Sequence, residues 1–232
     1  MRIEKNYTMQ DQPRRHVLRM LICSMLFAST CTGCKAVVLL GYLIGGPPSI
    51  EPPFDQQTKT SLKKDDMRIA VVCYAPKELK FDTEDVDDEL AQHVAMRLNS
   101  HGMKVIAPAA VQNWLDKNDD WDSPAEVGHA LEADWVIYID MQEYSLWEEG
   151  SMELYRGRTT AMVKVFDMND GDGEEIFTKE IESVYPIRAP KPAHEIKRER
   201  FKALYLSRLS DEIGQLFYEH FAGDEIAHGV VD

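Results

Sequence analysis

Residues 67–74 read Met-Arg-Ile-Ala-Val-Val-Cys-Tyr, an apolar run in which Arg68 is the only charged residue. Continuous apolar runs of this length are typical of strands that are buried on both faces of a sheet. An acidic turn follows Thr83, and apolar residues then recur at every fourth position, at Val86, Leu90, Val94 and Leu98. This spacing predicts a helix with one buried face that ends near Gly102. Residues 104–107, Lys-Val-Ile-Ala, predict a second strand.

Two shorter helices are expected next. The first is predicted over residues 109–116. The second has a strong start signal, because Ser123 is a typical cap, Pro124 suits the first helical position and Glu126 completes a capping box. We expect this helix to run to Leu131.

The rest of the chain is predicted to form three strands and a final helix. The turn at residues 169–173, Asn-Asp-Gly-Asp-Gly, favours a hairpin, since these residues tolerate positive φ. The apolar stripe of residues 193–222 predicts a long C-terminal helix. The strands are expected at residues 135–144, 155–167 and 175–185. This order predicts an α/β (α+β) fold, with a single mixed β-sheet of about five strands, helices packed mainly on one face and a long C-terminal helix.

The N-terminal segment has the three-part pattern of an export signal. Basic residues, among them Arg14 and Arg19, precede an apolar run that begins at Met20 and ends in the small residues Thr32 and Gly33 before Cys34. Such segments are excluded from fold analysis. The pattern predicts a lipoprotein-type signal peptide at residues 1–33, a lipidated N-terminus and a Pro/Gly-rich tether at residues 34–66, and a globular α/β domain at residues 67–232.

Cys34 is therefore the predicted lipidation site. Cys31 is a rival, but it lacks a glycine or alanine directly before it. An uncleaved membrane anchor is a second alternative, because residues 36–45 are also apolar and only Lys35 separates them from the first run. Ordinary cleavage without lipid, or no export at all, remains a third. The lipid would make the membrane the first partner of the protein.

Charge and cysteine content restrict the remaining functions. The chain has 26 basic and 40 acidic residues, and without residues 1–33 it keeps 21 basic and 38 acidic residues, a net charge of −17. Phosphate backbones repel such a surface, so no nucleic acid is expected as a partner. Cys73 is the only cysteine beyond the signal and tether, which excludes an internal disulfide there, and we expect it to be a small buried side chain.

Five segments resemble a known fold group. The sequences RIAVVCYAP, DELAQHVAMRL, KVIAP, ALEADWVIYIDMQEYS and YRGRTTAMVKVFDMNDGD are similar to the pattern shared by the TolB amino-terminal domain and the CsgG and LpoB lipoproteins. Ala133-Asp134 and residues 167–171 occupy its most specific places. The resemblance covers about residues 67–185. It implies an envelope lipoprotein that acts through protein contacts and has no catalytic residue, although strands long enough for a pore are not evident.

The sequence gives no sign of enzymatic chemistry. It contains no G-x-S-x-G, H-E-x-x-H or phosphate-binding glycine loop, and its histidines lack metal-ligand spacing. Neither a catalytic residue nor a metal or cofactor is therefore predicted. The acidic turn at residues 169–173 lacks the full ligand pattern of a calcium loop.

Aromatic and basic residues around the loop between the predicted strands at residues 135–144 and 155–167 form the candidate partner contact, since exposed Tyr, Trp and Arg are frequent in binding hot spots. These residues are Tyr144, Trp147, Tyr155, Arg156 and Arg158. Ordinary packing at strand ends is the alternative interpretation.

Taken with the predicted lipid, these features favour a non-catalytic protein-interaction or envelope-assembly module. It would be lipid-anchored in the cell membrane or outer membrane, with its domain in the periplasm and an envelope protein as its partner. The alternative is a structural linker between membrane and cell wall. The sequence leaves the oligomeric state open.

Overall fold

The computed structural model describes residues 49–63, 67–81, 83–169 and 171–221. The predicted signal peptide, Cys34, Cys31 and residues 35–48 lie outside the described residues. None of the helices within the described ranges combines the length and apolarity that crossing a bilayer requires.

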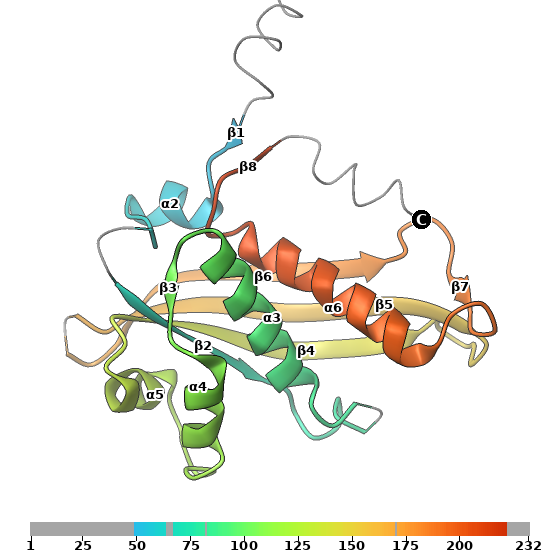
Figure 1. The fold of residues 1–232 in the computed structure, drawn as a ribbon, viewed down its shortest axis with the longest axis horizontal. Helices are drawn as coiled ribbons and strands as arrows, with labels where there is room; N and C mark the ends of the chain where they lie inside the picture. Colours follow the sequence, from blue (N-terminus) through green and yellow to red (C-terminus); the bar gives the residue numbers. More distant parts are fainter. Residues whose placement is uncertain (1–48, 64–66, 82, 170, 222–232) are drawn as a thin grey trace, which may run out of the picture. The chain divides into compact units, whose positions relative to one another are not determined.

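The sheet is mixed and has five main strands in the order β3-β2-β4-β5-β6 (Figure 1). β2 pairs in parallel with both β3 and β4, whereas β4, β5 and β6 form an antiparallel meander. A short strand, β7, adds to the start of β5. The strands are β2 (Arg68–Tyr74), β3 (Lys104–Val105), β4 (Trp135–Trp147), β5 (Leu154–Asp167), β6 (Glu174–Tyr185) and β7 (Lys191–Pro192). The predicted fold class is confirmed.

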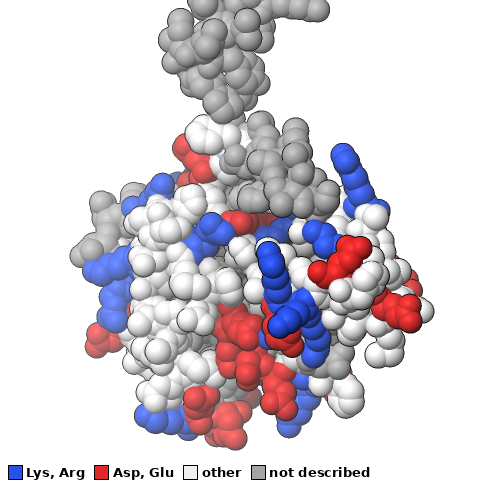
Figure 2. All heavy atoms as spheres, turned by 45° about the vertical axis from the view of Figure 1, so that its right-hand side comes forward, with Lys and Arg blue, Asp and Glu red and all other residues white. Residues whose placement is uncertain are grey.

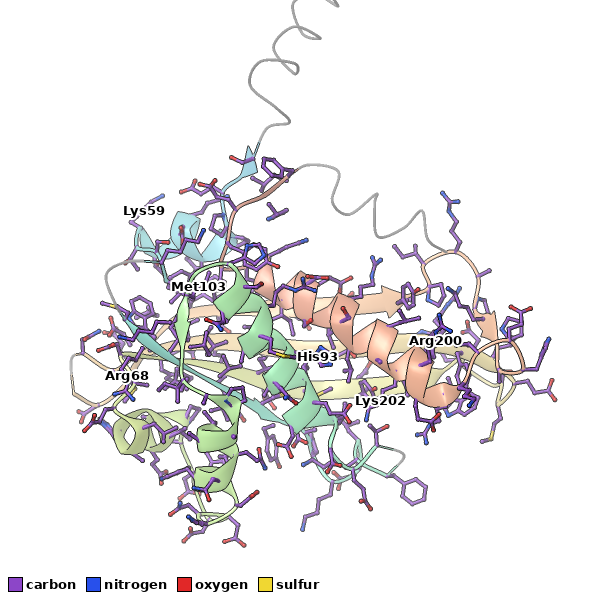
Figure 3. All side chains as sticks on the ribbon, viewed as in Figure 1. Lys59, Arg68, His93, Met103, Arg200 and Lys202 are labelled. Carbon is purple, nitrogen blue, oxygen red and sulfur yellow. The ribbon has the colours of Figure 1, made fainter. Side chains whose placement is uncertain are left out.

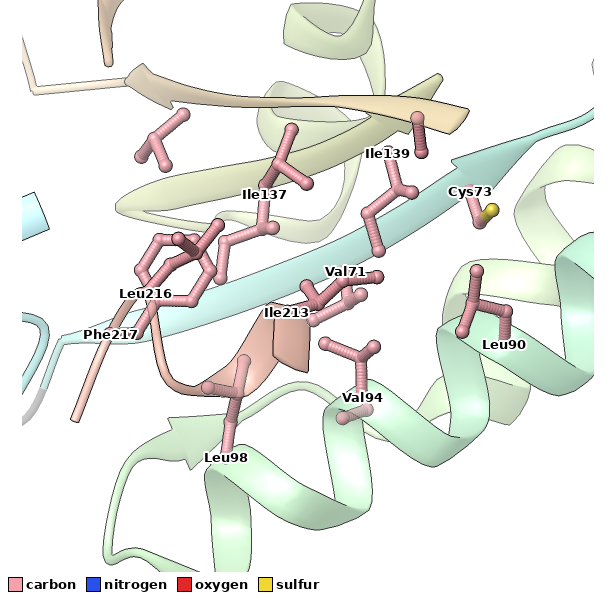
Figure 4. Close-up of a cluster of buried hydrophobic side chains, with 14 of the residues drawn as sticks. Val71, Cys73, Leu90, Val94, Leu98, Ile137, Ile139, Ile213, Leu216 and Phe217 are labelled. Carbon is pink, nitrogen blue, oxygen red and sulfur yellow. The ribbon is translucent and has the colours of Figure 1, made fainter. Parts of the chain in front are cut away.

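Side chains of β2 alternate between two hydrophobic clusters. Val71 and Cys73 lie in the larger one with Val94 of helix α3 (Val86–Ser100) (Figure 4). Val72 lies in the second cluster with Val111 of helix α4 (Pro108–Leu115). Because successive strand residues point to opposite faces, helices contact both faces of the sheet, whereas the sequence predicted helices mainly on one face. The two longer helices, α3 (Val86–Ser100) and α6 (Arg198–Gly214), share the face with the larger cluster, and α4 (Pro108–Leu115) and α5 (Pro124–Leu131) pack on the other.

Ion pairs join α3 to α6 above the sheet. Arg97 Nε lies 2.5 Å from Asp211 Oδ1, and Lys202 Nζ lies 2.7 Å from Glu89 Oε2. Figure 3 places Lys202 on the N-terminal half of α6, beside α3. The two helices therefore form one layer.

The local start and turn signals act as predicted. The Ser123 hydroxyl accepts from the amide of Ala125, and the Glu126 carboxylate accepts from the amide of Ser123, which gives the expected capping box of α5. Gly171 and Gly173 both have positive φ in the turn between β5 and β6. The turn therefore depends on residues without a β-carbon.

The tether prediction needs correction, because the folded unit begins at Ser49 and not at Met67. Helix α2 (Pro53–Thr58) places Phe54 in the core at 0% exposure, with its ring centre 5.4 Å from those of both Trp135 and Phe177. The prediction failed because this segment contains isolated apolar residues between prolines and polar residues, with no period to reveal them.

The C-terminal helix is also shorter than predicted. It spans Arg198–Gly214 instead of residues 193–222, and the apolar stripe continues beyond it because Leu216 and Phe217 enter the core from a non-helical segment. The chain then forms β8 (His220–Phe221), which pairs antiparallel with β1 (Ser49–Ile50). A stripe that packs on the core does not by itself define where a helix ends.

Candidate contact surface

Strands β4 and β5 bring the predicted contact residues together at one end of the sheet. Tyr144 faces Thr159, and Trp147 faces Tyr155, with one register shift between these pairs. Arg156 and Arg158 follow on β5. The five residues are thus neighbours, as the candidate contact requires.

The aromatic members serve the core more than the surface. Tyr155 is only 5% exposed and stacks on Phe201 of α6, with ring centres 5.0 Å apart, while Trp147 covers Tyr155 at 4.5 Å. Tyr144 packs against Tyr205 of α6, and burial raises the pKa of its hydroxyl. Tyr155 therefore does not present an exposed ring, and the expectation that it does is corrected by this packing.

Gly157 of β5 is what lets α6 approach so closely. A β-carbon at this position would lie 2.5 Å from the ring of Tyr205. The Tyr205 hydroxyl donates to the carbonyl oxygen of Ser183 at 3.2 Å and lies 2.8 Å from Thr159 Oγ1. A glycine, a ring and a buried hydrogen bond together hold α6 on β5 and β6.

The two arginines are held by one carboxylate. Glu148 Oε2 lies 3.0 Å from Arg156 Nη1, and Glu148 Oε1 lies 2.6 Å from Arg158 Nη2. The hydrogen bond from Arg158 keeps the pKa of Glu148 below its usual value. Arg156 also donates to the carbonyl oxygen of Arg188 at 3.2 Å. These bonds fix both side chains, so their first role is to order the loop after β4.

A hollow of about 220 Å³ lies beside these residues. It is lined by Thr83, Tyr144, Trp147 and Arg198, and by Phe81, whose side chain is 93% exposed. This ring leaves almost all of its apolar surface in solvent within the described part of the molecule, so the surface is available to a partner. The candidate contact surface is therefore the hollow with Phe81 at its rim.

Sequence analysis missed Phe81. Its signal was a single aromatic residue in the polar segment Lys-Glu-Leu-Lys-Phe-Asp between β2 and α3. No ring partner or apolar period explains a phenylalanine there, so the residue could have been singled out.

Charges on this side of the molecule are mixed. Figure 2 shows Lys and Arg side chains lying among Asp and Glu side chains. Among the described residues, no group of three His, Cys, Asp or Glu side chains is arranged to hold a metal ion.

The fold defines a class, an α+β domain with a single mixed sheet and helices packed on it. The chain matches no protein-family model and no curated protein sequence. It is distantly similar to several solved structures, two of which are described as lipoproteins. The PelC dodecamer from Paraburkholderia phytofirmans is 12% identical, with a TM-score of 0.42 over 74% of this chain and 98% of that one. Lipoprotein GNA1162 from Neisseria meningitidis is 16% identical, with a TM-score of 0.41 over 63% and 97%. A minor lipoprotein from Acinetobacter baumannii is 10% identical, with a TM-score of 0.31 over 64% and 90%. At such identities the similarity concerns the fold alone.

Proposed function

We propose that the protein is a lipid-anchored periplasmic lipoprotein whose domain acts as a non-catalytic interaction or envelope-assembly module. The observation that carries this proposal is Thr32-Gly33-Cys34 at the end of an export-type leader. Residues 35–48, between Cys34 and β1, reach about 50 Å when fully extended. A diacylglyceryl group on Cys34 supplies two acyl chains, which is what stable anchoring takes.

The finer assignment is to the fold group of the TolB amino-terminal domain, CsgG and LpoB. It is supported by the element order of residues 67–185, which is the order that the resembling segments imply. The resemblance suggests action through protein contacts. The sequence supports a role other than catalysis, because it offers no recognisable set of nucleophile, base and orienting group.

Substitution of cysteine in cells tests the anchor. We expect Cys34→Ser to abolish attachment of the lipid, because serine has no thiol to alkylate. The protein would then leave the membrane fraction or accumulate as an unprocessed precursor. Cys31→Ser is the matched control and is expected to be lipidated and sorted like the wild type. Loss of lipidation in Cys31→Ser with normal lipidation of Cys34→Ser would contradict the assignment to Cys34.

A photocrosslinking amino acid tests the contact surface. Placed at residue 81, it is expected to give a discrete crosslinked envelope protein in intact cells, because this ring stands free at the rim of the hollow. The control position is Met96, an exposed residue of α3 at 51% exposure. The same adducts at both positions, or none at residue 81, would favour the alternative role of a structural linker that recognises little.

A further inference from the structure

Strand β3 leaves most of the outer edge of β2 unpaired. β3 has only two residues, which face Arg68 and Ile69, and the last bond of this ladder runs from the amide of Ile106 to the carbonyl oxygen of Ile69 at 2.8 Å. The chain then turns away into α4 (Figure 1). From Val71 onward, β2 has a paired neighbour only on its β4 side.

The main-chain groups on this edge belong to Val71 and Cys73. The carbonyl of Arg68 points to the β4 side, where it accepts from the amide of Asp134, and that of Ile69 points to the β3 side. Since main-chain groups alternate along a strand, those of Val71 and Cys73 point outward. Within the described parts of the chain no residue hydrogen-bonds to these outward groups. Both residues are nearly buried, at 3% and 6% exposure, and unpaired main-chain groups in such places are costly.

A narrow cavity of about 240 Å³ adjoins these groups. We call it the β2 slot. It lies between α3 and α4, and its lining includes Val71, Cys73, Asp88, Ala91, Ala109 and Gln112. Helices thus form its two walls, and an open strand edge forms its floor.

The other long edge of the sheet is different. Strand β6 carries exposed charged residues along its length, including Lys179, Glu180 and Glu182. Charged side chains are a common protection of edge strands against pairing with other chains. The β2 edge has no such row of charges. Helices α3 and α4 cover it instead, and the β2 slot remains between them.

One carboxylate in the slot has no direct ion-pair partner among the described residues. Lys80 pairs with Asp87, and no Lys or Arg among the described residues forms an ion pair with the neighbouring Asp88. Burial, and then the nearby Asp87, raise the pKa of Asp88 to about 6, although the positive charge of Lys80 acts in the opposite direction. A cation that entered the slot would offset both effects.

We propose that the β2 slot binds an extended peptide segment of a partner protein, which adds to the sheet beside Val71 and Cys73 and directs a Lys or Arg side chain to Asp88. Addition of a strand to an open edge is a known mode of peptide recognition in which main-chain bonds provide the affinity. The small side chains of Ala91 and Ala109 on the two walls leave space for such a segment. The slot is separate from the surface around Phe81, so this inference does not depend on the function proposed for that surface.

The probe is the peptide acetyl-Val-Lys-Val-Lys-Val-amide, titrated into the full chain labelled with nitrogen-15 in detergent micelles. We expect the amide signals of Val71 and Cys73 to shift with saturable dependence on the peptide. The same peptide with methylated main-chain nitrogens is expected to bind about tenfold more weakly, because it loses two or more hydrogen bonds. A peptide with Glu in place of Lys is expected to bind more weakly still.

Two protein variants complete the test. Asp88→Asn is expected to weaken binding of the Lys peptide about threefold and to reduce its salt dependence. The matched control is Glu84→Gln, which removes an exposed charge that does not line the slot, and it should bind as the wild type does. Equal binding of the methylated peptide, or no shift at Val71 and Cys73 at millimolar peptide, would overturn the proposal. The second result would mean that water or the protein's own chain occupies the slot.

Discussion

At the scale of single residues, two positions organise the candidate contact surface through packing and ion pairs. Gly157 admits the ring of Tyr205, and Glu148 holds two arginines. Such positions act through packing and geometry, so their effects should appear in stability before they appear in binding.

Substitution of Gly157 tests the close approach of α6. We expect Gly157→Ala to lower the free energy of unfolding by about 2 kcal/mol, because the added methyl group overlaps the Tyr205 ring in a packed core. Chemical denaturation measures the loss. In a Tyr205→Leu background, the same substitution should cost clearly less, since the two sites are in contact. Equal costs in both backgrounds would show that the ring is not the obstacle.

Substitution of Asp88 gives a pH-dependent effect on stability. Because the pKa of Asp88 is raised from 3.8 to about 6, its ionised form opposes folding. The protonated carboxyl group contributes stability that is complete below pH 3.8 and is lost as the pH rises through 6. Asp88→Asn should therefore raise the free energy of unfolding at pH 7 by about 1 kcal/mol. This value allows for solvent screening and for the favourable effect of the helix dipole on a carboxylate in the first turn of α3.

The pH dependence is the measurement that checks this explanation. Thermal or chemical unfolding is followed from pH 3.5 to pH 7.5, with Glu84→Gln as the control. We expect the gain from Asp88→Asn to become small near pH 3.5, where the Asp88 carboxyl group is mostly neutral in the folded and the unfolded state. A gain that is the same at all pH values would rule out the carboxylate as its cause.

At the scale of elements, regular patterns were readable from the sequence and isolated contacts were not. Helix α3 follows from four-residue spacing and α5 from its capping box, and both have the predicted bounds to within a few residues. Helix α2 and the β1–β8 pair were not predicted, because one buried phenylalanine and two-residue strands leave no period. Their existence depends on tertiary contacts that only the folded chain provides.

Substitution of Phe54 tests whether α2 belongs to the domain. We expect Phe54→Ala to lower the free energy of unfolding by about 3–5 kcal/mol, because it removes a ring that contacts Trp135, Phe177 and Phe217. Gln57→Ala, an exposed change in the same helix, should have little effect. A loss below about 1 kcal/mol for Phe54→Ala would indicate that this segment belongs to the tether and not to the folded domain.

At the scale of the whole molecule, a mixed-sheet domain follows the proposed lipoprotein signal and its connecting segment. The sequence predicted the fold class, and it predicted that the aromatic and basic residues of β4 and β5 would lie together. That they contact a partner stays a prediction. It could not predict that Tyr155 would turn inward or that Phe81 would be left in solvent, since exposure depends on how α6 packs across β5. The β2 slot was equally hidden, because it results from the early end of β3.

The central claim is the lipid on Cys34, and intact-protein mass spectrometry of the chain extracted from membranes tests it most directly. The account predicts a polypeptide that begins at Cys34 and carries the added mass of a diacylglyceryl group. A polypeptide that begins at Met1 with no added mass would contradict it.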